Sequence, residues 1–171
     1  MSAAGKISPA LRAMFLLLAL ACSGCAGTLT GQVLDARTGQ PVARAVVLGV
    51  WTKAAGLPGL PHTEVVDVSE TETDAQGRFT LERAGGLVID EESLTVYKFG
   101  YVAWNNLYVF PSSARRESTR IPSKIALDEF PQTQSHQSHI SFLGNAAAVF
   151  MYGWDRIPKL WKGIQPERKM R

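Results

Sequence analysis

The chain has few side chains that could carry out covalent or metal chemistry. Its three histidines are His62, His136 and His139, and its two cysteines are Cys22 and Cys25. A hydrolase needs a nucleophile with a base, and a zinc site needs three or four ligands. His136 and His139 could share one side of a helical turn, but their Gln- and Ser-rich surroundings predict a loop, and no third ligand is implied nearby. We therefore expect no metal, no cofactor and no catalytic residue, and a small hydrolase that uses His136 or His139 is the least favoured alternative.

An apolar run close to the N-terminus indicates export from the cytoplasm. Lys6 and Arg12 precede residues 13–21, which are apolar but too few to span a bilayer. This arrangement is typical of a secretory signal. Cleavage after Ala19-Leu20-Ala21 would satisfy the rule for ordinary secretion.

The residues that follow this run suggest a lipid anchor instead. The sequence LACSGCAG, residues 20–27, resembles the lipobox of bacterial lipoproteins, in which cleavage exposes a cysteine that is then diacylated. The resemblance implies a signal peptide over residues 1–24 and acylation of Cys25, with Cys22 as the alternative. Neither cysteine is followed by Asp, so the resemblance favours the outer membrane, with the protein facing either the periplasm or the cell surface.

Charge argues against a nucleic-acid partner. Loss of Lys6 and Arg12 with the signal leaves 16 basic residues against 15 acidic ones, a net charge of about +1. Such a chain has no overall field that would attract DNA or RNA. The charges are uneven, however, because residues 62–92 are acidic and residues 154–171 are basic. We interpret these segments as two solvated surfaces that could attract each other.

Short alternating runs separated by turns predict an all-β domain. Strands are expected at residues 28–35, 45–51, 78–82, 94–99, 102–104, 107–110 and 125–127. Residues 45–51 are apolar at consecutive positions, so this strand should lie inside a sheet. Asp35 and Asp74 precede Gly39 and Gly77, and we expect their carboxylates to accept backbone hydrogen bonds within turns.

Three blocks resemble the carboxypeptidase regulatory-like domain: GQVLDARTGQPVARAVV (residues 31–47), TETDAQGRFTL (residues 71–81) and LTVYKFGYVAW (residues 94–104). The resemblance implies a seven-stranded Greek-key transthyretin-like β-sandwich, covering residues 25–127. The chain departs from the family at Phe99, where Pro is common, and at residues 52–63, a long insertion that could build a site at one end of the sandwich. The zinc signature of the catalytic carboxypeptidases is missing.

Residues 128–171 form the third segment, a loop followed by an amphipathic tail. Asn145 is predicted to cap a helix from Ala146 to about Arg156. Apolar residues that follow a helical spacing could pack over the sandwich edge or, alternatively, lie on the bilayer. These residues are Phe150, Trp154, Ile157, Trp161 and Ile164.

The predicted function is that of a non-enzymatic cell-envelope lipoprotein. Its β-sandwich would be a binding or scaffolding module for another, unidentified envelope protein. An alternative is a carbohydrate or peptidoglycan binder, in which Trp51, Trp104 and Tyr108 form a stacking surface for sugars. Burial of these aromatics in the core is the simpler expectation.

Overall fold

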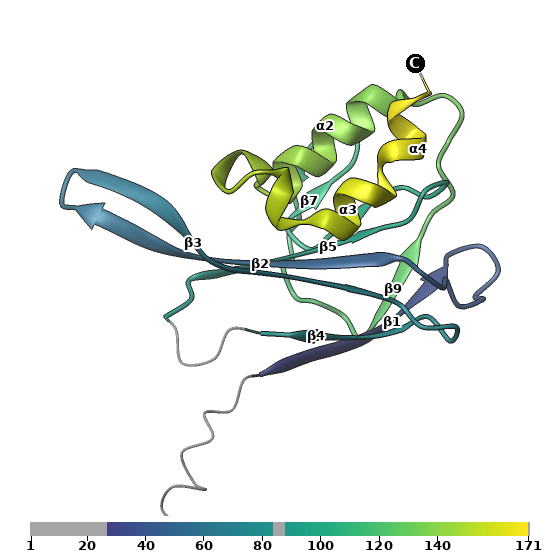
Figure 1. Ribbon diagram of the computed structural model, residues 1–171, viewed down its shortest axis with the longest axis horizontal. Helices are drawn as coiled ribbons and strands as arrows, with labels where there is room; N and C mark the ends of the chain where they lie inside the picture. The colour runs from purple at the N-terminus through teal and green to yellow at the C-terminus, as the bar shows by residue number, and fades with distance from the viewer. Residues whose placement is uncertain (1–26, 84–87, 171) are drawn as a thin grey trace, which may run out of the picture.

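The computed structural model describes residues 27–83 and 88–170, and this part of the chain is mostly β-structure with a helical C-terminal segment (Figure 1). The predicted signal peptide, residues 1–24, and both predicted acylation sites, Cys22 and Cys25, lie outside the described residues. No helix within residues 27–83 and 88–170 has the length and apolar character needed to cross a membrane.

The described strands form two main sheets and one small hairpin. The strands are β1 (Thr28–Asp35), β2 (Val46–Leu57), β3 (Leu60–Glu72), β4 (Arg78–Glu82), β5 (Glu91–Tyr97), β6 (Trp104–Asn105), β7 (Tyr108–Val109), β8 (Ala114–Arg115) and β9 (Lys124–Leu127). One sheet has the order β4-β1-β9, the second has the order β3-β2-β5-β6, and β7 pairs with β8. Strand β1 runs antiparallel to β4 and parallel to β9. The described residues thus contain more than the seven expected strands, because the sequence did not predict the long strand β3 or the two-residue strand β8.

The first core lies between the two sheets. It contains residues from both of them, such as Val33, Val47, Phe79, Leu94 and Ile125. In β4 the buried residues alternate with exposed ones, as expected for a strand with one face on a core.

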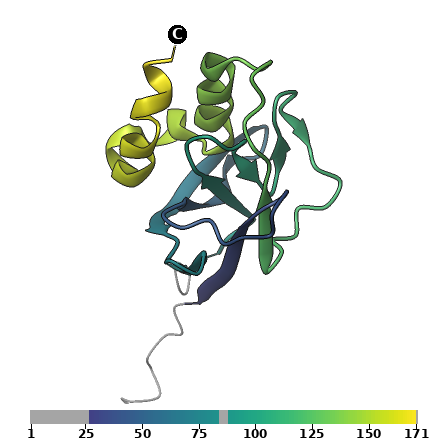
Figure 2. The same cartoon turned by 90° about the vertical axis from the view of Figure 1, so that its right-hand side faces the viewer.

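A second core lies on the other face of the β2 sheet. Strand β2 is buried at every position from Val46 to Trp51, which confirms that it is an interior strand. Alternate side chains point to opposite faces of a sheet, so Val46, Leu48 and Val50 face away from the first core. A group of helices covers this face (Figures 1 and 2).

The covering elements are α2 (His136–Ala146), the short 3-10 turns η1 (Val149–Met151) and η2 (Trp154–Arg156), α3 (Pro158–Gly163) and α4 (Gln165–Arg168). Ile157, Leu160 and Ile164 are completely buried among them and the sheet. Ile157 and Ile164 of the predicted stripe therefore pack on the sheet, and Trp154 is partly buried, whereas Phe150 is 80% exposed and Trp161 is 37% exposed.

An acidic residue of the edge strand β3 helps to fix this tail. The Glu70 carboxylate accepts the backbone N–H groups of Lys159 at 2.9 Å and Leu160 at 2.8 Å, at the start of α3. The first N–H groups of a helix lack partners within the helix, so a carboxylate there satisfies them. This contact joins the acidic segment of the chain to the basic one.

The predicted helix position was wrong. Helix α2 ends at Ala146, where the helix was expected to begin, and its N-cap is Ser135, whose hydroxyl accepts the N–H of Ser138. The predicted loop before Ser141 is therefore partly helical. The buried residues of α2 are spaced as on one face of a helix, but the first of them is a histidine, which obscures the apolar pattern. These residues are His139, Phe142, Leu143 and Ala146.

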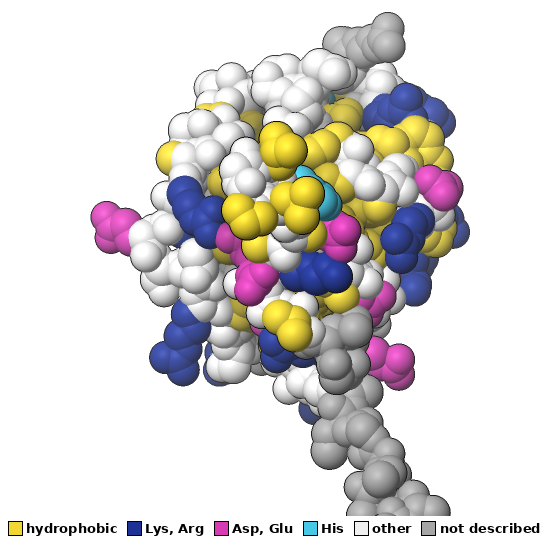
Figure 3. Space-filling model, turned by 90° about the vertical axis from the view of Figure 1, so that its left-hand side faces the viewer, with side chains coloured by type: hydrophobic (Ala, Val, Ile, Leu, Met, Phe, Trp, Pro, Cys, Tyr) yellow, Lys and Arg dark blue, Asp and Glu magenta, His cyan; other side chains and the backbone are white. Residues whose placement is uncertain are grey.

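The insertion at residues 52–63 is not a loop. Strands β2 and β3 continue through it and pair up to Leu57 and Leu60, on either side of a two-residue turn. Strand β5 pairs with β2 only as far as Thr52, so the outer half of this hairpin has no third strand among the described residues. Leu57 and Leu60 at the tip are 73% and 74% exposed. The face seen in Figure 3 carries apolar side chains as well as acidic and basic ones.

The turns that follow Asp35 and Asp74 form as predicted. Asp35 accepts the backbone N–H groups of Arg37 and Thr38, and Asp74 accepts those of Gln76 and Arg78. These bonds hold the pKa of both carboxyl groups below its ordinary value, the largest cause being the Thr38 bond at Asp35 and the Arg78 bond at Asp74.

Candidate functional site

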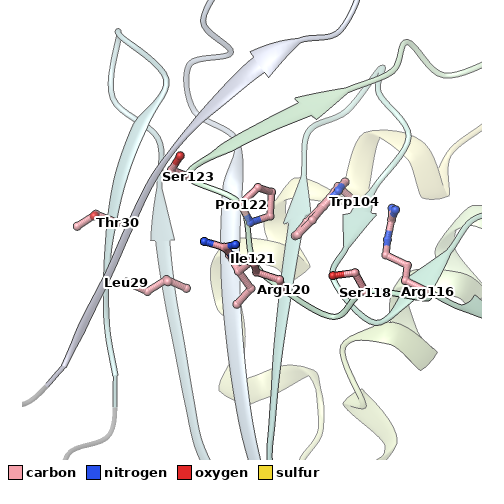
Figure 4. Close-up of a pocket in the computed structure, with 9 residues that line it drawn as sticks. All are labelled: Leu29, Thr30, Trp104, Arg116, Ser118, Arg120, Ile121, Pro122 and Ser123. Carbon is pink, nitrogen blue, oxygen red and sulfur yellow. The ribbon is translucent and has the colours of Figure 1, made fainter.

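An open groove lies between strand β1 and the segment that leads from β8 to β9. Its volume is about 660 Å³. Side chains of both segments and of β6 surround it, as Figure 4 shows. The lining residues are Leu29, Thr30, Trp104, Arg116, Ser118, Arg120, Ile121, Pro122 and Ser123.

Arg116 is held in place on one side of this groove. Its Nε donates to the backbone oxygen of Asn105 at 2.7 Å, and its guanidinium carbon lies 5.5 Å from the centre of the Trp104 ring. The amide of Asn105 is itself buried and donates to the Ser93 and Thr95 hydroxyls. Within the described residues no carboxylate lies within 4 Å of the Arg116 guanidinium. The terminal N–H groups of Arg116 are thus held in place, and no carboxylate of the described residues neutralises the guanidinium charge.

Arg120 carries a second positive charge at the groove. It is exposed, and no ion pair to it is found in residues 27–83 and 88–170. Leu29, Arg120 and Ile121 also line a neighbouring hollow, which holds Asp90, Glu91 and Glu92.

The acidic residues of this neighbouring hollow are already engaged. Glu91 pairs with Arg115, and Glu92 accepts the indole N–H of Trp51 at 2.8 Å and lies 3.7 Å from Arg83. Asp90 accepts the backbone N–H of Ala54. A cationic groove therefore borders an acidic hollow whose carboxylates have partners.

The three aromatics predicted to bind sugar do not form one surface. Trp51 is completely buried in the core between the sheets, so it offers no ring face to a ligand. Tyr108 is partly buried and lines a different hollow of about 400 Å³ beside Phe150. Trp104 lines the groove and is partly buried.

A second polar cluster lies in the C-terminal segment, around the carboxylate of Glu167. Glu167 is 2% exposed, although it is charged at neutral pH. Oε1 lies 2.7 Å from Nδ1 of His139 and 2.9 Å from Nδ1 of His136, and Oε2 accepts the Tyr97 hydroxyl at 2.8 Å. A buried charge requires such partners, so the carboxylate joins α4, α2 and β5.

The histidines of this cluster have different roles. Nε2 of the completely buried His139 accepts the backbone N–H of Ala103 at 2.8 Å, so its Nδ1 carries the proton that is donated to Glu167. Both ring nitrogens of His139 are used, and it has no atom for a substrate. The His136 ring stacks on Phe130 at 4.6 Å and is partly exposed. No hydroxyl or thiol is hydrogen-bonded to the His136 ring within the described part of the chain.

The surroundings shift the pKa values in opposite directions. Burial alone would raise the pKa of Glu167, but hydrogen bonds from His139, His136 and Tyr97 favour the charged form, and the net pKa lies below its ordinary value of 4.5. Burial, and then the Glu167 charge, strongly raise the pKa of Tyr97, so its hydroxyl remains a donor.

Sequence reasoning did not find Glu167 or Tyr97. Glu167 lies 28 positions after His139 within a charged tail, and Tyr97 lies in a strand, so no local motif connects them. No group of three or more possible metal ligands is found in residues 27–83 and 88–170. The cluster is built to hold the tail on the sheet.

Comparisons with known proteins give little more. No protein-family model matches the sequence, and no curated protein matches it. Among solved structures, the chain is similar to a 9R-lipoxygenase from Cyanothece PCC8801, with a TM-score of 0.30 and 16% identity over 72% of this chain. The match covers 20% of the lipoxygenase, so the chain spans about a fifth of that protein's length. So low a TM-score carries no argument about fold or activity.

Proposed function

We propose that this protein is a non-enzymatic cell-envelope lipoprotein whose β-domain is a binding or scaffolding module. In this proposal the two sheets are the transthyretin-like Greek-key sandwich of a carboxypeptidase regulatory-like domain. Cys25, or Cys22, carries the lipid and holds the domain at the outer membrane. The partner is another envelope protein.

The observation that supports a binding role is the groove beside Trp104. It contains two arginines without acid partners among the described residues, and one of them is held in a fixed position. Function in such a module depends on a site rather than on the fold. The groove begins at Leu29, close to where the expected anchor would join the domain. A ligand there would be held near the membrane surface.

Crosslinking in intact cells tests this proposal. The protein would be extracted in mild detergent, and mass spectrometry would identify both the attached molecules and the N-terminal peptide. An acylated peptide and a specific envelope protein are the expected results. The Arg120→Gln variant should lose the partner. Arg37 is exposed in the turn that follows β1, and the Arg37→Gln variant should retain the partner. An unmodified N-terminus together with an unchanged Arg120→Gln profile would contradict the proposal.

A carbohydrate or peptidoglycan binder is the second candidate. It is supported by Trp104, whose ring lines the groove with the Ser118 hydroxyl close by in Figure 4. Titration with cell-wall polymers separates the two candidates, because a flat response to every polymer would leave only the protein partner.

A further inference from the structure

The fixed guanidinium of Arg116 is the starting point for assigning a ligand to the groove. Arginine ordinarily loses side-chain entropy when it binds an anion, because its side chain is long and flexible. Here the Asn105 carbonyl and the Trp104 ring already hold the guanidinium. A planar guanidinium with free N–H groups donates two parallel hydrogen bonds to a carboxylate or phosphate. Arg116 is therefore prepared to bind an anionic group.

The remaining lining of the groove fits a small polar ligand with an apolar face. Figure 4 shows Trp104 lying in this view between Pro122 and Arg116, and Thr30, Ser118 and Ser123 also line the groove. A sugar ring has an apolar face that packs on aromatic and aliphatic groups, and hydroxyls that bond with protein hydroxyls. Pro122 and Trp104 can supply the first kind of contact, and Ser118 the second.

The acidic hollow next to the groove limits how far a negatively charged ligand can extend. Asp90, Glu91 and Glu92 line this hollow together with Arg115, which pairs with Glu91. Asp90 has no basic partner among the described residues, and like charges repel when they are brought together. A polyanion that extended from the groove across this hollow would be attracted by the arginines but repelled by the carboxylates, so its extra units would add little binding free energy. The charge pattern thus favours one acidic unit in the groove.

We propose that the groove binds an acidic sugar, a single uronic-acid-like unit whose carboxylate pairs with Arg116 and whose ring lies against Trp104. Arg120, on the same segment as Arg116, adds attraction. This assignment rests on the second candidate function, that of a carbohydrate binder, and names its ligand. It requires no metal and no covalent step.

A titration of the full-length protein in mild detergent tests the assignment, with tryptophan fluorescence or NMR as the readout. The probes are glucuronate, glucose, inorganic phosphate and polygalacturonate. Glucuronate should bind at least about tenfold more tightly than glucose, which corresponds to the loss of one charge-assisted hydrogen bond. Polygalacturonate should bind no more than a few-fold more tightly than glucuronate when its concentration is expressed as the concentration of chain ends.

Variants identify the groups that bind. Arg120→Gln should weaken glucuronate binding about three- to tenfold and reduce its dependence on salt. Arg116→Lys keeps the charge but loses the planar fork, so binding should fall about tenfold. Arg37→Gln is the matched control and should leave the affinity unchanged. Circular dichroism of each variant checks that it is folded.

Several results would overturn the assignment. Equal affinity for glucose and glucuronate would show that the carboxylate does not contribute to binding. Equal affinity for phosphate and glucuronate would show that the groove does not recognise the sugar ring. If glucuronate does not bind while Arg120→Gln abolishes a crosslinked envelope protein, the acidic sugar is excluded and the proposed binding function stands. If neither effect is found, the groove has no binding role.

Discussion

Nδ1 of His139 lies 2.7 Å from Oε1 of Glu167, although the two residues are 28 positions apart in the chain. The same carboxylate accepts the Tyr97 hydroxyl from the sheet, 70 positions away from Glu167. One buried acid therefore connects the last helix, the first helix of the tail and a strand of the sheet. This arrangement makes Glu167 a sensitive position for stability.

Glu167→Gln should lower the free energy of unfolding by about 1–3 kcal/mol. Glutamine has the same size, but its amide group replaces one acceptor oxygen by a donor, so a buried donor loses its partner. Urea denaturation of the two proteins measures the difference. Glu117→Gln is the control, because Glu117 is exposed, and should change stability by less than about 0.5 kcal/mol. Equal stability of all three proteins would show that the cluster does not hold the tail.

Stability should fall as the pH is lowered below about 4.5, and part of this loss should come from Glu167. The folded pKa of Glu167 is lowered from its ordinary value of 4.5, so the charged form is the one that stabilises the fold. That stabilisation is complete above the unfolded pKa and disappears as the pH falls through the folded pKa. Asp35 and Asp74 shift in the same direction, so some acid sensitivity remains in every variant.

Urea midpoints at pH 7 and pH 3 measure this dependence. The change between the two pH values should be smaller in Glu167→Gln than in the unaltered protein, because the variant has no carboxylate to protonate at this position. An identical change in both proteins would exclude Glu167 as a source of acid sensitivity.

Two glycine substitutions should change stability in opposite directions. A Cβ at Gly49 in β2 would lie 2.5 Å from Cη2 of Trp51 and 2.7 Å from Cδ2 of Leu81, so Gly49→Ala should cost roughly 1–3 kcal/mol by overpacking. A Cβ at Gly144 in α2 would meet its nearest neighbour, Trp154, at 3.8 Å. Gly144→Ala should therefore raise stability by about 0.5–1 kcal/mol, the helix propensity difference. Thermal unfolding of both variants checks the two signs.

A chain that starts at Gly27 should remain in solution and should not sediment with anionic liposomes. It keeps the whole tail but lacks Cys22 and Cys25, and the apolar residues Ile157 and Leu160 are buried against the sheet. Sedimentation with the liposomes would show that exposed tail residues bind lipid independently of an anchor. Trp161→Ala would then identify the contact, because Trp161 is 37% exposed.

The sequence was a good guide to strands β1 and β4 for a physical reason, although it did not predict β3. Strand β1 has the predicted ends, and the alternation of Phe79 and Leu81 with polar residues marks one buried face. Turn residues such as Asp74 act on neighbours within a few positions, so a local pattern is enough to find them.

The tail and the candidate site depended on contacts between distant residues. His139 occupies a core position because Ala103 and Glu167 satisfy its two nitrogens, and neither partner is near it in sequence. Residues 52–63 were expected to be an insertion that could build a site at one end of the sandwich, yet pairing along β2 and β3 continues through them to the tip. Of the three predicted aromatics, Trp104 lines the groove, and its arginine neighbours come from a polar segment without a motif.

The two-sided burial of β2 has a consequence for the order of folding. Val46, Leu48 and Val50 come early in the chain, but most of the buried side chains that share their core belong to residues 142–164. Roughly ninety further residues must be made before this cover is available, and an uncovered apolar sheet face promotes aggregation. A chain that ended before α2 would therefore carry this apolar face without most of its cover.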